Sequence, residues 1–189
     1  SNDFESRVDK DSHYSIDMQN LSFKFANSED LFFNNLSFQF EKDKHYIITG
    51  ENGSGKSTLL GVLAGALNPK KGSVIRSSSK IGYIGASPLI LEDSLRENLN
   101  YGSEQKINDT DLIKFIEEFK IFDDFDEKIL DKKITNKTLS SGQMQKVSFI
   151  RAFASGCDIL FLDESTANLD KETKLQISQI LSSKKITII

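Results

Sequence analysis

The sequence has a single cysteine, Cys157, among its 189 residues. One cysteine cannot form an internal disulfide, and this usage is compatible with a reducing compartment. The surrounding residues, Ser155-Gly-Cys-Asp158, offer it no metal-binding or redox partner, so we interpret Cys157 as structural.

Long apolar runs and a basic excess are absent as well. No segment approaches the roughly 18 apolar residues that cross a bilayer, and no signal peptide is visible. With a formal net charge of −4, we expect no nucleic-acid partner. The opening Ser-Asn resembles a cloning remnant, so we expect a fragment of a longer protein. Hydrophobic residues make up 38% and charged residues 28%, as in an ordinary soluble domain.

The stretch from Gly50 to Thr58 reads Gly-Glu-Asn-Gly-Ser-Gly-Lys-Ser-Thr and fits the Walker A pattern G-x-x-x-x-G-K-[ST]. An apolar segment typical of a strand precedes it at 45–49, and a helical segment follows at 59–64. Glycines let successive N–H groups face one oxyanion, and a helix N-terminus adds partial positive charge. The predicted phosphate site consists of Gly50, Glu51, Asn52, Gly53, Ser54, Gly55, Lys56, Ser57 and Thr58.

In such a loop the lysine reaches the β- and γ-phosphates of a nucleotide, and the hydroxyl after it holds Mg²⁺. We therefore expect Lys56 to bind phosphate and Ser57 to bind the metal. A Gly/Ser-rich turn before a helix is the simpler alternative. It does not explain why strand, helix and Lys-Ser-Thr occur in register.

The first forty residues predict a β layer. Residues 1–13 are polar and lack periodicity, so we interpret them as a linker, tag or frayed terminus. Apolar and polar residues alternate at 21–25 and at 36–40, which predicts two half-buried strands with a turn near Asn27-Ser28-Glu29. An antiparallel layer therefore precedes the Walker A loop.

The middle of the chain changes from strands to helices. Short strands are predicted at 73–75 and 80–84, and the pattern becomes helical from about Ser94 to Phe125. Asp109 or Thr110 is the expected N-cap of a helix there. Its apolar stripe consists of Leu112, Ile113, Phe115, Ile116 and Phe119.

The last fifty residues alternate helix and strand. A helix is predicted at 141–155 with Ser140 or Ser141 as cap and Gly156 as stop, and Asp170 caps a later helix. Buried strands are predicted at 159–162 and from 186 onward. The fold class is therefore α/β: a P-loop NTPase core with a mostly parallel sheet, the antiparallel layer and an inserted helical subdomain. The expected boundaries are a linker at 1–13, an ATPase domain at 14–189 and a helical subdomain at about 90–155.

The predicted strand 159–162 ends in Asp163-Glu164. An aspartate at the carboxyl end of a core strand can hold Mg²⁺ opposite Ser57, and the next glutamate can polarise an attacking water. Acidic turns after buried strands are common. Paired with a Walker A loop, these residues predict Asp163 as a metal ligand and Glu164 as the catalytic group.

Leu139-Ser-Ser-Gly-Gln143 resembles the LSGGQ signature of ABC transporter nucleotide-binding domains, with Ser141 in place of the first glycine. The helix after it, with its Arg151-Ala152, and the D-loop-like Ala167-Asn-Leu-Asp170 are similar to that family as well. Phe25 falls where the family has an aromatic residue that stacks on adenine. Ser94–Asn98 resembles the segment after the Q-loop in the form common among exporters of the family. The resemblance runs from about Phe23 to the last residue.

The resemblance implies an ATP- and Mg²⁺-dependent ATPase that powers transport. Two such domains pair head to tail, so that each nucleotide lies between one subunit's Walker A and the other's signature. It implies a transmembrane domain as partner and a location on the cytoplasmic side of a membrane. Further nucleotide contacts are expected from Phe25, Ser140, Ser141, Gly142, Gln143 and Asp170.

Three departures from the family pattern bear on activity. Ala86 stands where the Q-loop glutamine is expected, Ser141 alters the signature, and the H-loop histidine would fall beyond Ile189. His13 and His45 precede the Walker A loop and cannot replace that histidine. We therefore expect this chain to bind Mg-ATP but to hydrolyse it slowly.

Two other functions stay open. Ala86 favours a degenerate regulatory module that binds nucleotide without much hydrolysis, whereas Lys56 and Glu164 oppose it. A soluble ABC-type ATPase acting on ribosomes or DNA usually carries paired domains, coiled-coil arms or basic linkers, and none is visible here. A simple P-loop kinase leaves the signature at Leu139–Gln143 unexplained.

Overall fold

The computed structural model describes residues 3–26, 28 and 30–189. They divide into two compact units. The first unit consists of the described residues of Ser1–Tyr83 together with Asp158–Asp163 and Lys185–Ile189, and the second of Ile84–Cys157 and Glu164–Lys184.

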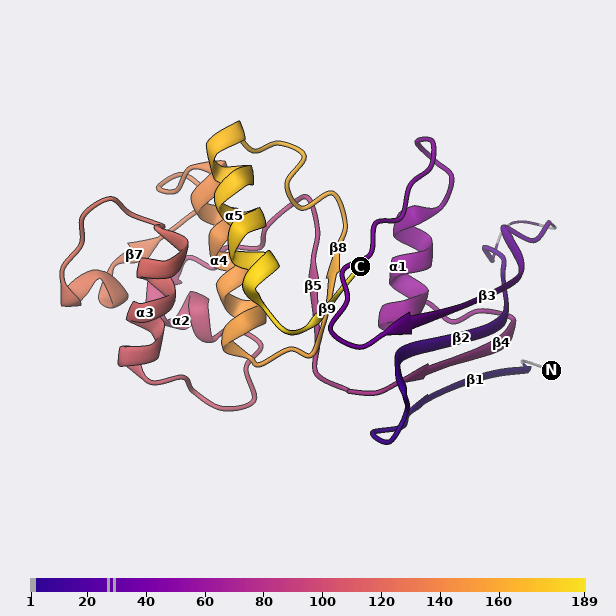
Figure 1. The fold of residues 1–189 in the computed structure, drawn as a ribbon. Coiled ribbons are helices and arrows are strands. Elements are labelled where there is room, and N and C mark those ends of the chain that lie inside the picture. The colour runs from indigo at the N-terminus through magenta and orange to yellow at the C-terminus, as the bar shows by residue number, and fades with distance from the viewer. Residues whose placement is uncertain (1–2, 27, 29) are drawn as a thin grey trace. The chain divides into compact units, whose positions relative to one another are not determined.

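The first unit contains two sheets and a helix between them (Figure 1). Its four-stranded sheet has the order β1-β4-β2-β3, with β4 antiparallel to β2 and β2 antiparallel to β3. The bounds are β1 Asp3–Val8, β2 Tyr14–Phe23, β3 Phe33–Glu41, α1 Lys56–Ala64 and β4 Lys71–Arg76. The predicted antiparallel layer is thus confirmed. Asn27 and Glu29 of the predicted turn lie outside the described residues.

The second sheet of this unit has the order β5-β8-β9. Its strands are β5 Ile81–Ile84, β8 Ile159–Leu162 and β9 Thr187–Ile188. β8 and β9 run parallel, and residues of both sheets pack with α1 in one apolar core. The core residues are Ile16, Met18, Leu21, Phe23, Phe40, Leu60, Val62, Leu63, Val74, Ile159, Phe161 and Ile189. Burying these side chains orients α1, and with it the loop that leads into the helix.

Two expectations for this unit were wrong or incomplete. Residues 3–8 form strand β1, parallel to β4, where the sequence predicted a linker. Strand pairing uses backbone groups, so a polar segment with exposed side chains can still pair with a sheet edge. In the predicted strand 45–49, only His45 forms a bridge, to Ile188, because β9 is two residues long and provides no longer partner.

The second unit is mainly helical (Figure 1). Its helices are α2 Leu95–Asn100, α3 Asp109–Phe119, the 3-10 helix Glu127–Asp131, α4 Ser141–Ala154 and α5 Lys171–Ser183. The unit also contains a two-stranded sheet of β6 Asp93–Ser94 and β7 Lys133–Ile134. The apolar stripe of α3 is buried at Leu112, Ile116 and Phe119. The predicted cap was wrong: Asn108, one residue earlier, accepts a hydrogen bond from the Asp111 N–H at 2.9 Å.

Together the two units confirm the α/β class. Side chains of α4 hold the loops of the second unit by bonding to backbone carbonyls. Arg151 donates to the carbonyls of Asn98 and Leu89, and Lys146 donates to that of Lys120 at 2.9 Å. These hydrogen bonds tie α4 to the segments at Leu89, Asn98 and Lys120, so the helix that follows the signature also organises the chain around it.

Candidate functional site

The Walker A loop enters α1 through two glycines in the left-handed region. Gly53 has a φ of 82° and Gly55 a φ of 96°. The Ser54 N–H donates to the Glu51 carbonyl at 3.2 Å, which closes the loop as a tight turn. Gly55 is the N-cap of α1 and makes no side-chain capping bond. The first turn of α1 thus has no side-chain acceptor at its N-terminus, as an anion-binding helix start requires.

The Lys56 side chain folds back over this loop. Its Nζ donates to the carbonyl oxygens of Gly50 at 3.0 Å and Glu51 at 2.9 Å. The loop backbone therefore holds the ammonium group beside the turn made by the glycines. A cation in this place adds to the positive potential of the helix start.

Phenylalanine rings cover one side of the loop. A Cβ atom at Gly55 would collide with the Phe32 ring and lie 3.0 Å from Cε1 of Phe33. The Phe32 ring contacts that of Phe25 with centroids 5.2 Å apart, and both side chains are more than 40% exposed. The sequence indicated Phe25 but not Phe32. The signal that could have found it is the apolar run Leu31-Phe32-Phe33.

Asp163 joins the end of β8 to the Walker A helix. Its Oδ1 accepts a hydrogen bond from the Ser57 hydroxyl at 2.7 Å, and its Oδ2 accepts one from the Tyr83 hydroxyl at 2.9 Å. Tyr83 comes from β5, the neighbour of β8 in the sheet. Burial, the hydrogen bond and the charge of Asp163 raise the pKa of Tyr83 to about 12. Sequence reasoning paired Ser57 with Asp163 but missed Tyr83.

A Mg²⁺ ion fits this pair of oxygens. Among the described residues, no group of three or more histidine, cysteine, aspartate or glutamate side chains could hold a metal ion. Mg²⁺ does not need one, because it is usually held by one or two carboxylates together with substrate phosphates and water. The Ser57 hydroxyl and the Asp163 carboxylate are hard oxygen ligands of that kind.

Glu164 directly follows Asp163 in an unusual backbone conformation. Its φ is 52°, in the left-handed region, and its side chain is exposed. The turn is closed by a hydrogen bond from the Ala167 N–H to the Glu164 carbonyl at 3.0 Å. Such a conformation costs a non-glycine residue roughly 1–2 kcal/mol and is found preferentially at functional sites.

The signature residues form the start of α4. Ser140 is the N-cap, and its Oγ accepts from the Gln143 N–H at 3.1 Å. Gln143 Oε1 in turn accepts from the Ser140 N–H at 2.9 Å, and its Nε2 donates to the Ile121 carbonyl at 3.0 Å. The two side chains form a capping box. Ser140 and Gln143 therefore stabilise the helix, whatever else they bind.

Asp170 plays the same part for α5. Its Oδ1 accepts from the Thr173 N–H at 2.9 Å, and its Oδ2 accepts from the Thr173 hydroxyl at 2.7 Å. The backbone hydrogen bond from Thr173, followed by that of its hydroxyl, lowers the pKa of Asp170. The predicted cap is confirmed.

The ABC transporter family matches residues 33–167, well over half of the chain. This chain belongs to the ABC transporter family. Its motifs make it the ATP-binding module of that family, which is a family of ATPases.

The relatives are named as ATP-binding proteins of transporters or transport systems. A glutathione/L-cysteine transport system ATP-binding/permease protein of Haemophilus influenzae is 27% identical over 187 residues, covering 88% of this chain and 32% of that protein. A lactococcin-A transport/processing ATP-binding protein of Lactococcus lactis is 27% identical over 194 residues, covering 94% of this chain and 27% of that protein. An uncharacterized ABC transporter ATP-binding protein of Bacillus subtilis is 29% identical over 184 residues, covering 87% and 79%.

The chain spans about a third or less of the first two of these relatives. The first of them is named an ATP-binding/permease protein. Within the described part of the present chain, no helix is long and apolar enough to cross a membrane.

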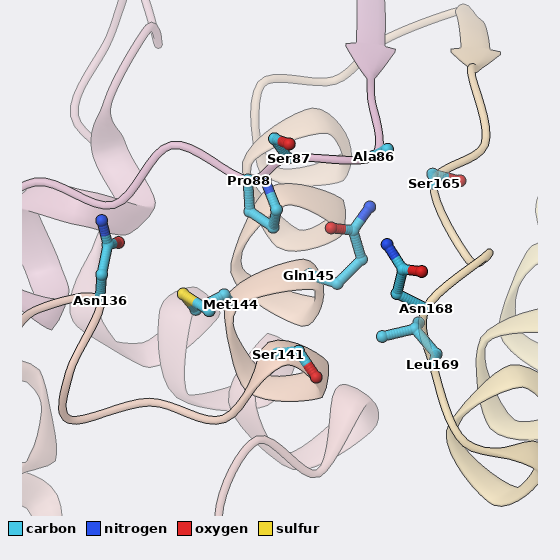
Figure 2. Close-up of a pocket in the computed structure, with 10 residues that line it drawn as sticks. All are labelled: Ala86, Ser87, Pro88, Asn136, Ser141, Met144, Gln145, Ser165, Asn168 and Leu169. Atoms are coloured by element: carbon cyan, nitrogen blue, oxygen red, sulfur yellow. The ribbon is translucent and has the colours of Figure 1, made fainter.

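Residues 86–88, where the sequence predicted the Q-loop, line a pocket of about 340 Å³ in the second unit (Figure 2). Figure 2 shows Gln145 reaching from α4 toward the segment that carries Ala86, and Gln145 Nε2 donates to the Gly85 carbonyl at 3.0 Å. Ala86 has a methyl group where the resemblance predicted the side chain of a glutamine. The lining residues are Ala86, Ser87, Pro88, Asn136, Ser141, Met144, Gln145, Ser165, Asn168 and Leu169.

Proposed function

We propose that this module binds Mg-ATP at the Walker A loop and hydrolyses it to drive transport across a membrane. The observation that carries the proposal is the 2.7 Å hydrogen bond between Ser57 and Asp163. It joins two motifs 106 residues apart in the sequence into one oxygen-lined site. A Gly/Ser-rich turn before a helix, or an acidic turn after a buried strand, does not by itself require this pairing.

In the proposed binding mode, the loop Gly50–Thr58 surrounds the phosphates and Phe25 stacks on the adenine. Lys56 leaves the two carbonyls it now contacts and extends its ammonium toward the β- and γ-phosphates, because phosphate oxygens are stronger acceptors. Ser57 and Asp163 hold Mg²⁺, which neutralises charge on the phosphates.

Glu164 is the proposed catalytic group. Its exposed carboxylate orients the attacking water and accepts its proton. The left-handed backbone at Glu164 supports this role, because such strained conformations occur preferentially at functional sites.

A second ATP-binding domain completes each site in this proposal. Ser140, Ser141, Gly142, Gln143 and Asp170 face the nucleotide of the partner domain. The capping box already uses the N–H groups of Ser140 and Gln143. The N–H groups of Ser141 and Gly142 therefore bond the γ-phosphate, helped by the positive end of α4.

The relatives support the proposed membrane partner and location. Because a relative is named an ATP-binding/permease protein, we place this module on the cytoplasmic side of a membrane, attached to or bound by a transmembrane domain. Hydrolysis then releases the γ-phosphate that joins the two ATP-binding domains, and the membrane domain follows the change.

Ala86 favours a second candidate, a regulatory module with weak hydrolysis. A methyl group can neither coordinate Mg²⁺ nor form a hydrogen bond with water. This candidate shares the binding site and differs in turnover, so we propose slow hydrolysis for this chain under either function.

The test compares Lys56→Ala with Lys42→Ala, an exposed lysine of the same unit. Loss of a charge-assisted phosphate contact should weaken ATP binding about 10- to 100-fold, measured by calorimetry, while Lys42→Ala keeps the affinity. Equal affinity in all three proteins would overturn the proposed site. Glu164→Gln should keep ATP binding and lose hydrolysis in the full-length protein. Turnover of wild type as low as that of Glu164→Gln would favour the regulatory module.

A further inference from the structure

We propose that Tyr83 is a positioning residue that holds the Asp163 carboxylate in place for the metal. This inference rests on the proposed function. Tyr83 itself touches neither nucleotide nor metal in this account. It acts through its hydroxyl group, which donates to Oδ2 of Asp163 at 2.9 Å.

The two oxygens of Asp163 have different partners. Oδ1 accepts from Ser57, and Oδ2 accepts from Tyr83. The Ser57 hydroxyl has one hydrogen and two lone pairs, so it can offer a lone pair to a cation while it donates to Oδ1. Ser57 is then a metal ligand itself, whereas Tyr83 bonds the other oxygen and is not a ligand. Tyr83 therefore orients the carboxylate from outside the pair of metal ligands.

The Tyr83 ring is itself held by the sheet. It lies beside the ring of Phe161, with centroids 6.3 Å apart, and Phe161 is fully buried in the core. β5 and β8 are neighbouring strands; Tyr83 lies on β5 and Asp163 directly follows β8, so one sheet fixes the positions from which both side chains extend. Groups placed on strands are held more accurately than groups on loops.

The charge on Asp163 is left for the cation. Lys56 donates to two loop carbonyls, and Asp163 takes part in none of the ion pairs of the described residues. Two neutral hydroxyls orient the carboxylate without neutralising it. Tyr83 precedes Ala86 by three residues, so the segment that lacks the expected amide carries this positioning hydroxyl.

The experiment compares Tyr83→Phe with wild type in two nucleotide-binding titrations. The first measures ATP affinity in excess chelator, without free divalent cation. The second measures the Mg²⁺ concentration that gives half of the gain in ATP affinity. Loss of a group that orients a metal ligand lowers metal affinity by about 10- to 100-fold. For the partly exposed Tyr83 we expect about tenfold more Mg²⁺ to be needed, with unchanged affinity in chelator.

Tyr46→Phe is the matched control. In wild type, the Tyr46 hydroxyl also makes a hydrogen bond in the first unit: it accepts from the Glu41 N–H at 2.7 Å and does not contact Asp163. It should leave both titrations unchanged, and thermal melting should show Tyr83→Phe folded. An unchanged Mg²⁺ requirement in Tyr83→Phe, or an equal loss in chelator, would overturn the inference. Absence of ATP binding by wild type would instead overturn the proposed function.

Discussion

Two helices of this protein begin in opposite ways, one in each unit. α1 begins after Gly55, whose φ of 96° and missing side chain leave the helix start without a side-chain cap. α4 begins after Ser140, in an extended conformation, and Ser140 and Gln143 cap it reciprocally. The start of α1 leaves its backbone N–H groups for a ligand. In the start of α4, the capping box already bonds the N–H groups of Ser140 and Gln143.

The difference between the two helix starts matches the different phosphate contacts proposed for the Walker A loop and the signature. A loop that must surround several phosphate oxygens needs flexible glycines and open donors. A motif that contacts one terminal phosphate can use a preformed helix start with two remaining N–H groups, those of Ser141 and Gly142. The start of α4 is stabilised in part by its own capping box, and the open start of α1 is stabilised by the core behind it.

Among substitutions at the two helix starts, Gly55→Ala is expected to change stability most. A Cβ there would need a strained φ and would collide with the Phe32 ring, so we expect a loss of about 2–3 kcal/mol in unfolding free energy. ATP affinity should fall as well. Urea denaturation and calorimetry measure the two losses.

Gly53→Ala is the control for Gly55→Ala. Its φ is 82°, but a Cβ there has no atom within 4 Å. It should lose only the roughly 1–2 kcal/mol of backbone strain. Equal losses at both glycines would mean that Phe32 does not shape the open helix start.

A medium effect is expected from Ser140→Ala, which opens the capped helix start. Loss of the N-cap should lower the unfolding free energy by about 1 kcal/mol, measured by urea denaturation. Ser141→Ala, one residue later and outside the capping box, should change it by less than about 0.5 kcal/mol. A Ser140→Ala protein as stable as wild type would remove the contrast between the two helices.

The smallest effect on stability is expected from Gly142→Ala. A Cβ there would lie 3.6 Å from Thr173 Oγ1, an ordinary contact, and no positive φ is needed. Alanine also favours a helix over glycine by about 0.5–1 kcal/mol, so the melting temperature should stay or rise. ATP binding by the single module should also stay, whereas ATP-driven pairing measured by size-exclusion chromatography should weaken. A clear loss of stability would show that Gly142 is needed by the fold itself.

Patterns within short stretches predicted much of this fold. The helix after Lys56, the strand before Asp163 and the capped helix at Asp170 were all found in place. Each depends on neighbours a few residues apart, such as a cap or an apolar period. The cap of α3 was missed by one or two residues because Asn108, Asp109 and Thr110 are all able to cap a helix.

What remained hidden depends on partners far along the chain. β1 was interpreted as a linker because its pairing with β4 uses backbone groups that every residue has. Phe32 and Tyr83 were not singled out because their sites are made by Gly55 and Asp163, 23 and 80 residues away. No local pattern records such a contact.

The sequence by itself determined the family, the phosphate loop, and the pairing of Ser57 with Asp163 as a hypothesis. Those conclusions rest on the spacing of residues whose chemistry is local. Only the tertiary structure decided that Tyr83 holds the second oxygen of Asp163 and that the start of α1 is open while that of α4 is capped. Such hydrogen bonds depend on side-chain directions, which are set when strands and helices pack.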